Sequence, residues 1–340
     1  MAVTLKQIAE AAGVSRGTVD RVVHGRGRVN PELEKRILAL LKENDYQPNR
    51  FGQGLVMSGR PVKLCAIFQF SETPFMQMVI QGAERAQAAL KTMNTEFIIE
   101  NISSYDESKM LAAIDKMIDA GVCGLALTPG NSSAIHTKIH KLISAGIPVI
   151  TLNSDAPDTG RTAYVGLDNY RAGQTAAGLM SIIFRNGGTI LPISGYSENT
   201  SHSQRIQGFK DVAVQFPKLF IMDTAYCQDS DTIAEEIVKK ALSRHSDLAG
   251  IYIAGNGQSG VCRALCRLKK TEDICVLCFD MTPQNIKELK SNNLDFIIDQ
   301  DAEAQGYKPA MLLYDQLVLG KNCSSEYLYT DICIKTKFNL

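Results

Sequence analysis

The chain has 340 residues, which is too many for one hydrophobic core, so two or three folding units are expected. Hydrophobic residues make up 45 % of it and charged residues 21 %, as in soluble globular proteins. No apolar run reaches the roughly 20 residues that span a bilayer, which excludes an integral membrane protein. The first 13 residues have no apolar signal-peptide core, and the 9 cysteines are an odd number, so we expect a cytoplasmic protein without disulfides.

Charge is unevenly distributed along the chain, although the total is zero. Residues 1–60 contain ten Lys or Arg and six Asp or Glu, a net charge of +4, so the rest of the chain carries −4. A basic head on an acidic body is what a protein that binds the phosphate backbone of nucleic acid requires.

Three short helices are predicted in this head. Thr4 begins a capping-box pattern, and the helix that follows stops at Gly13. Ser15 caps a second helix, and Asn30 caps a third with Pro31 at its first position. The short turn at Gly13 favours a DNA-binding helix-turn-helix over the alternative, a generic three-helix bundle.

The run from Thr4 to Val23 and the motif Tyr46-Gln-Pro-Asn49 resemble the head of the LacI/GalR family of transcription regulators. The resemblance implies a DNA-binding domain over residues 1–47, a hinge over 48–60 and an effector-binding and dimerisation domain over 61–340. It also implies a homodimer that binds operator double-stranded DNA. The residues that it places on DNA are Thr4, Ser15, Arg16, Gly17, Thr18, Arg21, Asn49, Arg50 and Leu55.

The second helix is expected to enter the major groove, where the residues after its cap contact base edges. Arg16 can donate two hydrogen bonds to guanine, whereas Gly17 offers only a close approach. Thr18 and Ser15 suit phosphate contacts. Asp20 stands where the family usually has serine; it can pair with Arg16 or accept from a cytosine amine, and the sequence does not decide between these.

The hinge of the resembled family forms a short helix on operator DNA, and a leucine from each subunit wedges into the minor groove. Leu55 occupies that position here. Gly52 and Gly54 disfavour a helix by about 1 kcal/mol each relative to Ala, so we expect this segment to become helical only on DNA. A flexible linker is the alternative.

From residue 62 onward, apolar strands alternate with amphipathic helices, which predicts parallel sheets covered by helices. Eight or more strands in about 280 residues predict an α/β body of two lobes with one parallel sheet each. The expected strands are Leu64–Phe70, Thr95–Glu100, Gly124–Thr128, Pro148–Leu152, Thr189–Ser194, Leu219–Thr224, Gly250–Ala254 and Cys275–Phe279.

Polar residues follow several of these strands, and ligands bind at the carboxyl ends of parallel strands. Amide, carboxylate and guanidinium groups there suit the vicinal hydroxyls of a sugar. The body resembles the type I periplasmic-binding-protein fold of ribose receptors, which implies a monosaccharide or polyol effector. The residues expected to contact it are Phe75, Asn153, Asp155, Arg205, Asn256, Asp280 and Gln300. Asp168 and Asn169 are instead expected to cap a helix.

Other function classes have little support in the sequence. The phosphate-loop, HExxH and GxSxG motifs are absent, so we expect no enzyme and no cofactor. Cys275 and Cys278 lie on a predicted strand and point to opposite faces, and His136 and His140 have no further ligand beside them, so no metal is expected. The remaining alternative to a repressor is a sugar-transport receptor without a DNA role, which would leave the basic head unexplained.

Overall fold

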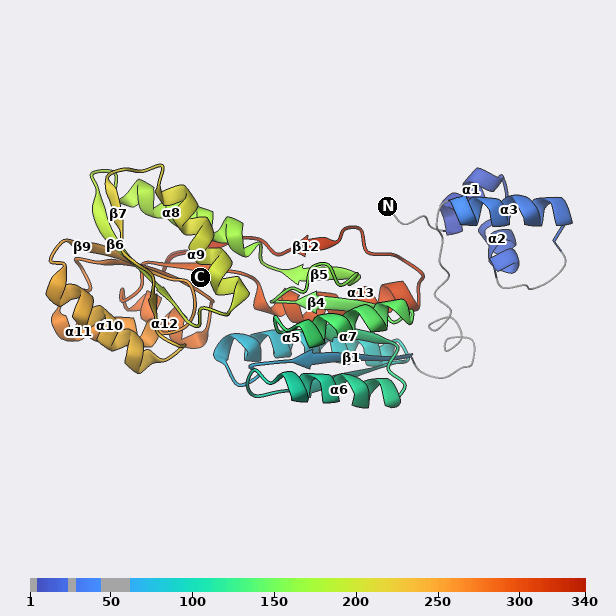
Figure 1. Cartoon of the computed structure of the whole chain (residues 1–340), viewed down its shortest axis with the longest axis horizontal. Coiled ribbons are helices and arrows are strands. Elements are labelled where there is room, and N and C mark those ends of the chain that lie inside the picture. Colours follow the sequence, from blue (N-terminus) through green and yellow to red (C-terminus); the bar gives the residue numbers. More distant parts are fainter. Residues whose placement is uncertain (1–4, 24–28, 44–61) are drawn as a thin grey trace.

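The computed structural model in Figure 1 describes residues 5–23, 29–43 and 62–340. Three helices form the head: α1 (Leu5–Ala12), α2 (Arg16–Val23) and α3 (Pro31–Glu43). They pack around a small core with Ile8, Val19 and Ile37 at its centre. Gly13 turns the chain between α1 and α2 with φ of +68°, a backbone conformation that glycine adopts without strain. The predicted helix-turn-helix is therefore confirmed.

The N-terminal lobe is a sheet of six parallel strands in the order β12-β5-β4-β3-β1-β2. Side chains alternate along β1, so Leu64 and Ala66 meet helices α5 and α13, whereas Cys65 and Ile67 meet α6 and α7. The strands are β1 (Val62–Phe68), β2 (Thr95–Asn101), β3 (Gly124–Leu127), β4 (Val149–Leu152), β5 (Ala163–Gly166) and β12 (Tyr327–Tyr329). The helices are α5 (Pro74–Thr92), α6 (Glu107–Asp119), α7 (Ser133–Ser144) and α13 (Ala302–Leu317).

The C-terminal lobe repeats this architecture with the strand order β13-β11-β10-β9-β6-β7, and β8 pairs with β6. Only the pairing of β13 with β11 is antiparallel in this sheet. The strands are β6 (Gly188–Ser194), β7 (Leu219–Ile221), β8 (Ala225–Tyr226), β9 (Leu248–Ile253), β10 (Cys275–Phe279), β11 (Phe296–Asp299) and β13 (Cys333–Lys335). The helices are α8 (Asn169–Ile183), α9 (Thr200–Ala213), α10 (Asp231–Arg244), α11 (Gln258–Leu268) and α12 (Pro283–Lys290).

The chain passes between the lobes three times: from β5 to α8, from β11 to α13 and from β12 to β13. Strands β5 and β11 both lead into the opposite lobe from their carboxyl ends. The carboxyl edges of the two sheets therefore face each other across the lobe boundary, as the ribbon in Figure 1 shows. This is the edge at which parallel sheets bind ligands.

The eight predicted strands are all present, although the one expected over Leu219–Thr224 pairs in β7 only as far as Ile221. The short strands β5, β8, β11, β12 and β13 have no counterpart among these eight, because two to four residues are too few to show a period. Among the described residues, no helix combines the length and the apolar character that crossing a membrane requires.

Two glycines bring helices α8 and α9 unusually close together. A Cβ on Gly173 would lie 2.0 Å from the carbonyl oxygen of Arg205, and one on Gly208 would lie 2.0 Å from that of Tyr170. No larger side chain fits at either position without a shift of the backbone. This close contact fixes the part of α9 that carries Arg205.

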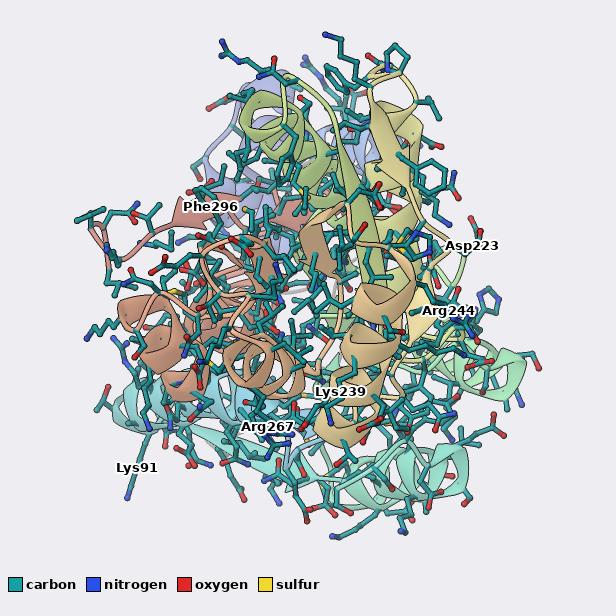
Figure 2. All side chains as sticks on the ribbon, turned by 90° about the vertical axis from the view of Figure 1, so that its left-hand side faces the viewer. Lys91, Asp223, Lys239, Arg244, Arg267 and Phe296 are labelled. Carbon is teal, nitrogen blue, oxygen red and sulfur yellow. The ribbon has the colours of Figure 1, made fainter. Side chains whose placement is uncertain are left out.

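A charged cluster joins helices α10 and α11 on the outer face of the C-terminal lobe, where Figure 2 labels Lys239 and Arg267. Glu235 lies at its centre: Lys239 Nζ is 2.9 Å and Arg263 Nε is 3.1 Å from its carboxylate, and Arg267 also pairs with it. Hydrogen bonds from Lys239 and Arg263 lower the pKa of Glu235 to about 2.

Candidate effector site and DNA-reading head

Arg205 is the most deeply placed cation of the predicted sugar site. Its side chain is 3 % exposed, and its guanidinium lies 3.9 Å above the centre of the Phe279 ring. Its Nε donates to Oδ1 of Asn169 (2.8 Å) and its Nη1 to the carbonyl oxygen of Ala254 (3.1 Å). The structure pairs only two of its N–H groups within the described residues, so the remaining donors can bind the oxygen of a ligand.

Asp280 and Gln300 follow the neighbouring strands β10 and β11, and they are hydrogen-bonded to each other. Both are buried, and Asp280 adopts a left-handed backbone with φ of +75°. Burial raises the pKa of Asp280, and the positive charge of Arg205 opposes that shift. The sheet edge thus presents a buried carboxylate acceptor in the electrostatic field of a buried cation.

Asn256 follows β9, the strand between β6 and β10, and is half-buried. Its backbone N–H donates to Oδ1 of Asp229 (3.1 Å), and its carbonyl oxygen accepts from Sγ of Cys227 (3.2 Å). The structure therefore brings Arg205, Asn256, Asp280 and Gln300 to one edge of one sheet.

The two predicted contacts Phe75 and Asn153 belong to the opposite lobe. Phe75 is buried in the first turn of α5, which Thr73 caps. Asn153 follows β4 in a left-handed conformation, with φ of +62°. Its carbonyl oxygen accepts from the hydroxyl of Tyr164 (3.1 Å) and from that of Ser201 (3.4 Å), and Ser201 lies on α9 of the C-terminal lobe. Asn153 thus lies where the two lobes meet.

The carboxylate of Asp155 accepts hydrogen bonds from side chains of the protein itself. Its carboxylate accepts from the guanidinium of the buried Arg161 and from the hydroxyl of Thr151 (2.7 Å). Arg161 in turn lies 4.7 Å above the centre of the Tyr327 ring on β12. These contacts tie the loop after β4 to β12, and a contact of Asp155 with the effector stays a prediction.

Sequence reasoning missed the part that Asn169 takes in the site. Asp168 caps α8 as expected, accepting from the N–H of Arg171 at 3.0 Å. Asn169, however, is buried and turns its amide to Arg205 and to the carbonyl oxygen of Leu167. Its position three residues after strand β5 was a usable signal, because polar residues at strand ends are the ones that meet in this fold.

His202 and Asp229 are two further residues that the sequence did not indicate. The Nδ1 atom of His202 is buried without a hydrogen-bond partner, and burial lowers the pKa of this histidine to about 3, so it is neutral at physiological pH. Burial raises the pKa of Asp229. Both contact the backbone of Gly195, where a Cβ would lie 2.1 Å from Oδ1 of Asp229 and 2.9 Å from Nδ1 of His202.

The head presents the start of α2 at its surface. Ser15 caps this helix: its hydroxyl accepts from the N–H of Thr18 (3.3 Å) and lies 3.0 Å from the hydroxyl of Thr18. Gly17 is exposed and has open space around it. The exposed Arg21 donates from Nε to the carbonyl oxygen of Gly17 (3.1 Å). Outside the described part of the chain lie the side chains of Arg16 and Asp20 and the residues Thr4, Asn49, Arg50, Gly52, Gly54 and Leu55.

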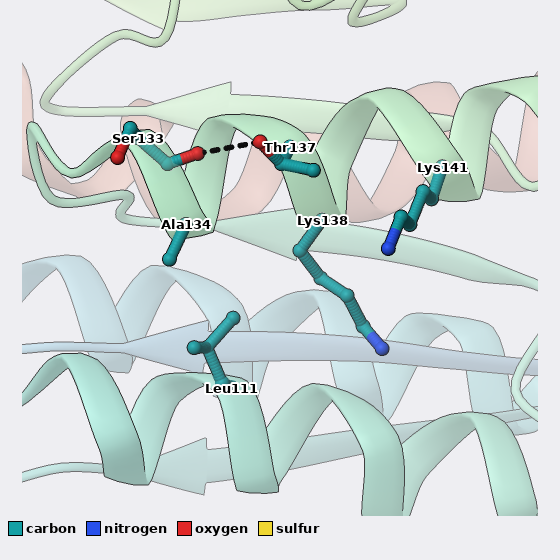
Figure 3. Close-up of a pocket in the computed structure, with 6 residues that line it drawn as sticks. All are labelled: Leu111, Ser133, Ala134, Thr137, Lys138 and Lys141. Carbon is teal, nitrogen blue, oxygen red and sulfur yellow. Dashed lines mark hydrogen bonds between the residues drawn. The ribbon is translucent and has the colours of Figure 1, made fainter.

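Two hollows on the N-terminal lobe lie away from this site. One of about 350 Å³ runs between α6 and α7 and is lined by Leu111, Ser133, Thr137 and two lysines, as Figure 3 shows. Its Lys138 is paired with Asp115. The other, of about 410 Å³, borders β2 and α6. Neither gathers buried polar groups, so we place the ligand site at the facing sheet edges.

Comparison with known proteins supports both parts of this description. Residues 66–322 match the family described as periplasmic binding protein domain, and residues 4–49 match that of bacterial regulatory proteins, lacI family. The transcriptional regulator CelR of Thermobifida fusca is 24 % identical over 331 residues, which is 92 % of each chain.

One further relative and one solved structure are similar to most of the chain. The ribose import binding protein RbsB of Bacillus subtilis is 25 % identical over 248 residues, 73 % of this chain and 79 % of that protein. The structure of GanP, a glucose-galactose binding protein from Geobacillus stearothermophilus, superimposes with a TM-score of 0.75 at 21 % identity, covering 83 % of this chain and 99 % of its own. This likeness confirms the fold. The larger part of the chain therefore belongs to the periplasmic binding protein domain family, and its N-terminal helix-turn-helix matches the lacI family of bacterial regulatory proteins.

Proposed function

We propose that this chain is a sequence-specific, DNA-binding transcription repressor whose operator affinity is controlled by a small sugar or polyol bound between its two lobes. The observation that carries this proposal is the buried cluster at the carboxyl edge of the C-terminal sheet. Arg205 keeps N–H donors that no described residue uses, and Asp280, which accepts a hydrogen bond from Gln300, supplies a carboxylate close enough to act on its charge. A neutral ligand rich in hydroxyl groups suits this set, because each hydroxyl both donates and accepts.

The boundary between the two lobes can couple ligand binding to DNA binding. Arg205, Asn256 and Asp280 lie in the C-terminal lobe, and Phe75 and Asn153 lie in the N-terminal lobe, so a ligand that contacts both sets favours one arrangement of the lobes. A ligand changes such an equilibrium only by its difference in affinity for the two arrangements. The head follows that change if two copies of the chain set the spacing of two DNA half-sites, which is why we propose a homodimer. We also propose that it acts in the cytoplasm, where operator DNA lies.

The test uses Arg205→Ala and Asp280→Ala, with Asp273→Ala as the matched control. Asp273 is an exposed residue of the same lobe, paired with Lys270. Each site variant leaves buried polar groups unpaired, which costs about 1–3 kcal/mol, so affinity for the sugar should fall roughly 5- to 150-fold in calorimetry. Affinity for an operator selected from random DNA should stay unchanged without sugar, since the head is a separate domain. Unchanged sugar affinity in both variants would show that the pocket lies elsewhere.

A sugar-transport receptor without a DNA role is the second candidate, because RbsB, a ribose import binding protein, is similar over 73 % of this chain. The helix-turn-helix at residues 4–49 distinguishes the two. Repeated selection from a pool of random DNA separates the two candidates: a repressor enriches one sequence, whereas a transport receptor enriches none. Fluorescence anisotropy then measures the affinity for the enriched sequence.

A further inference from the structure

We propose that Phe70 and Tyr105 form a second saccharide subsite beside the predicted one, so that the preferred effector has two or more sugar rings. The inference rests on the proposed function and extends it. The two rings are stacked on each other, with centroids 6.3 Å apart and an angle of 23° between their planes. Yet Phe70 remains 37 % and Tyr105 46 % exposed, so a broad aromatic surface faces solvent.

This aromatic pair lies at the ligand-binding edge of the N-terminal sheet. Phe70 comes two residues after β1, and Tyr105 comes four residues after β2. Strands β2, β1 and β3 are consecutive neighbours in the sheet, and all three run parallel. Both aromatic residues therefore lie at the carboxyl edge, which faces the other lobe.

Contacts between neighbouring loops make the pair continuous with the predicted site. The Tyr105 ring covers Gly130 in the loop after β3. In the same loop, the carbonyl oxygen of Pro129 accepts from the hydroxyl of Ser154 at 2.7 Å. Ser154 follows Asn153, one of the predicted sugar contacts. The aromatic surface thus begins one loop away from the first ring.

The surroundings hold the two rings in a fixed place. The buried Gln69 connects three loops: its N–H donates to the hydroxyl of Thr128 (2.7 Å), its amide donates to the carbonyl oxygen of Thr128 (3.2 Å), and its side-chain oxygen accepts from the N–H of Asp106 (3.0 Å). Phe70 adopts φ of +53°, which is unusual for a bulky residue. Such strain persists where the surrounding structure enforces it, and it concentrates at ligand sites.

A sugar ring suits this surface of two exposed aromatic side chains. The C–H face of a pyranose packs on an aromatic ring, while its hydroxyls remain in water. The pair also lies away from two of the three connections between the lobes: β2 is one edge of the sheet, whereas the connections from β5 and β12 leave near the opposite edge. A ligand that extends beyond the first ring toward β2 therefore reaches Phe70 and Tyr105.

The experiment compares one-ring and two-ring ligands on the full-length chain by calorimetry. Matched probes are D-glucose with maltose and cellobiose, D-galactose with lactose and melibiose, and D-xylose with xylobiose. The variants are Phe70→Ala, Tyr105→Ala and Gly130→Ala. The last introduces a Cβ that would lie 2.1 Å from the Tyr105 ring and so displaces it. Phe338→Ala is the control. This exposed aromatic residue follows β13 in the C-terminal lobe, and because β13 is antiparallel to β11, it lies away from the carboxyl edge of that sheet.

We expect at least one disaccharide to bind more tightly than its one-ring partner. Each of the three variants should lower that disaccharide affinity about 3- to 10-fold while changing monosaccharide affinity less than about twofold. Equal losses for one-ring and two-ring ligands, or disaccharide affinity unchanged in all three variants, would overturn the second subsite and leave the proposed function standing. If no saccharide of either size binds the unaltered chain, the proposed function itself fails, and this inference fails with it.

Discussion

At the scale of single residues, Arg205 is a buried charge that neighbouring side chains stabilise and orient. Burial lowers the pKa of this guanidinium, and the charge of Asp280 raises it again. The hydrogen bond to Asn169 and the contact with the Phe279 ring hold the group in one orientation. A ligand that meets Arg205 therefore finds its donors already placed, which reduces the entropy lost on binding.

A prediction at this scale concerns DNA reading. Arg16→Ala should cost about 1–3 kcal/mol on the selected operator and relax the preference at one base pair in each half-site, because its two hydrogen bonds to guanine are lost. Anisotropy titrations at fixed salt, with operators substituted one base pair at a time, measure both effects. Equal losses on the operator and on random DNA would remove Arg16 from base reading.

The matched controls for that experiment are Lys6→Ala and Arg50→Ala. We expect these basic residues to contact phosphate, so their removal should weaken binding to all sequences alike and reduce the salt dependence. Comparing the three variants separates recognition of sequence from attraction to the backbone.

At the scale of secondary-structure elements, the cluster around Glu235 leads to a pH prediction. Because the pKa of Glu235 is lowered from its usual 4.5 to about 2, its ionised form stabilises the fold. That contribution is complete above about pH 4.5 and disappears as the pH falls toward 2. Glu235→Gln should therefore lower the melting temperature at pH 7, and the difference from the unaltered chain should shrink as the pH falls below 4.5.

Glu236→Gln is the control for this measurement, since Glu236 is largely exposed and its ion pair among the described residues is with Lys239. Exposed ion pairs contribute little, so a small change is expected. Thermal unfolding followed by circular dichroism between pH 3 and pH 7 gives all three curves. A Glu235→Gln deficit that stays constant across this range would show that the cluster stabilises the lobe by packing rather than by charge.

At the scale of the whole molecule, the hinge segment joins the two functions, and its residues lie outside the described part of the chain. If it becomes helical on DNA, Gly52→Ala with Gly54→Ala should tighten operator binding by about fivefold per glycine, because each Ala favours a helix by about 1 kcal/mol. The double variant should also respond less to effector. Anisotropy titrations with and without sugar measure both quantities.

Leu55→Ala supplies the second half of that test. Loss of a wedging side chain should weaken operator binding and leave sugar affinity in calorimetry unchanged, since the wedge contacts only DNA. Unchanged operator affinity in both the double-alanine and the Leu55 variants would identify the hinge as a linker that does not enter the groove.

The sequence alone predicted the helix-turn-helix, the two α/β lobes and the positions of eight strands. It could do so because apolar periodicity, caps such as Ser15 and Asn30, and turns such as Gly13 depend on residues close together in the chain. Polar residues at strand ends also indicated Asp280 and Gln300, since parallel strands bring their carboxyl ends to one edge. Arg205, which lies on α9, was expected from the family resemblance.

Only the tertiary structure decided which side chains meet. Arg161, which pairs with Asp155, lies over the Tyr327 ring on β12, and Asn169 is hydrogen-bonded to Arg205; both arrangements join segments far apart in the chain. The stacking of Phe70 on Tyr105 likewise depends on strand order, since β2 follows β1 in the chain but lies at the sheet edge. Local patterns determine elements and the residues at their ends, whereas the partners of each side chain follow from the packing of distant segments, which no local pattern contains.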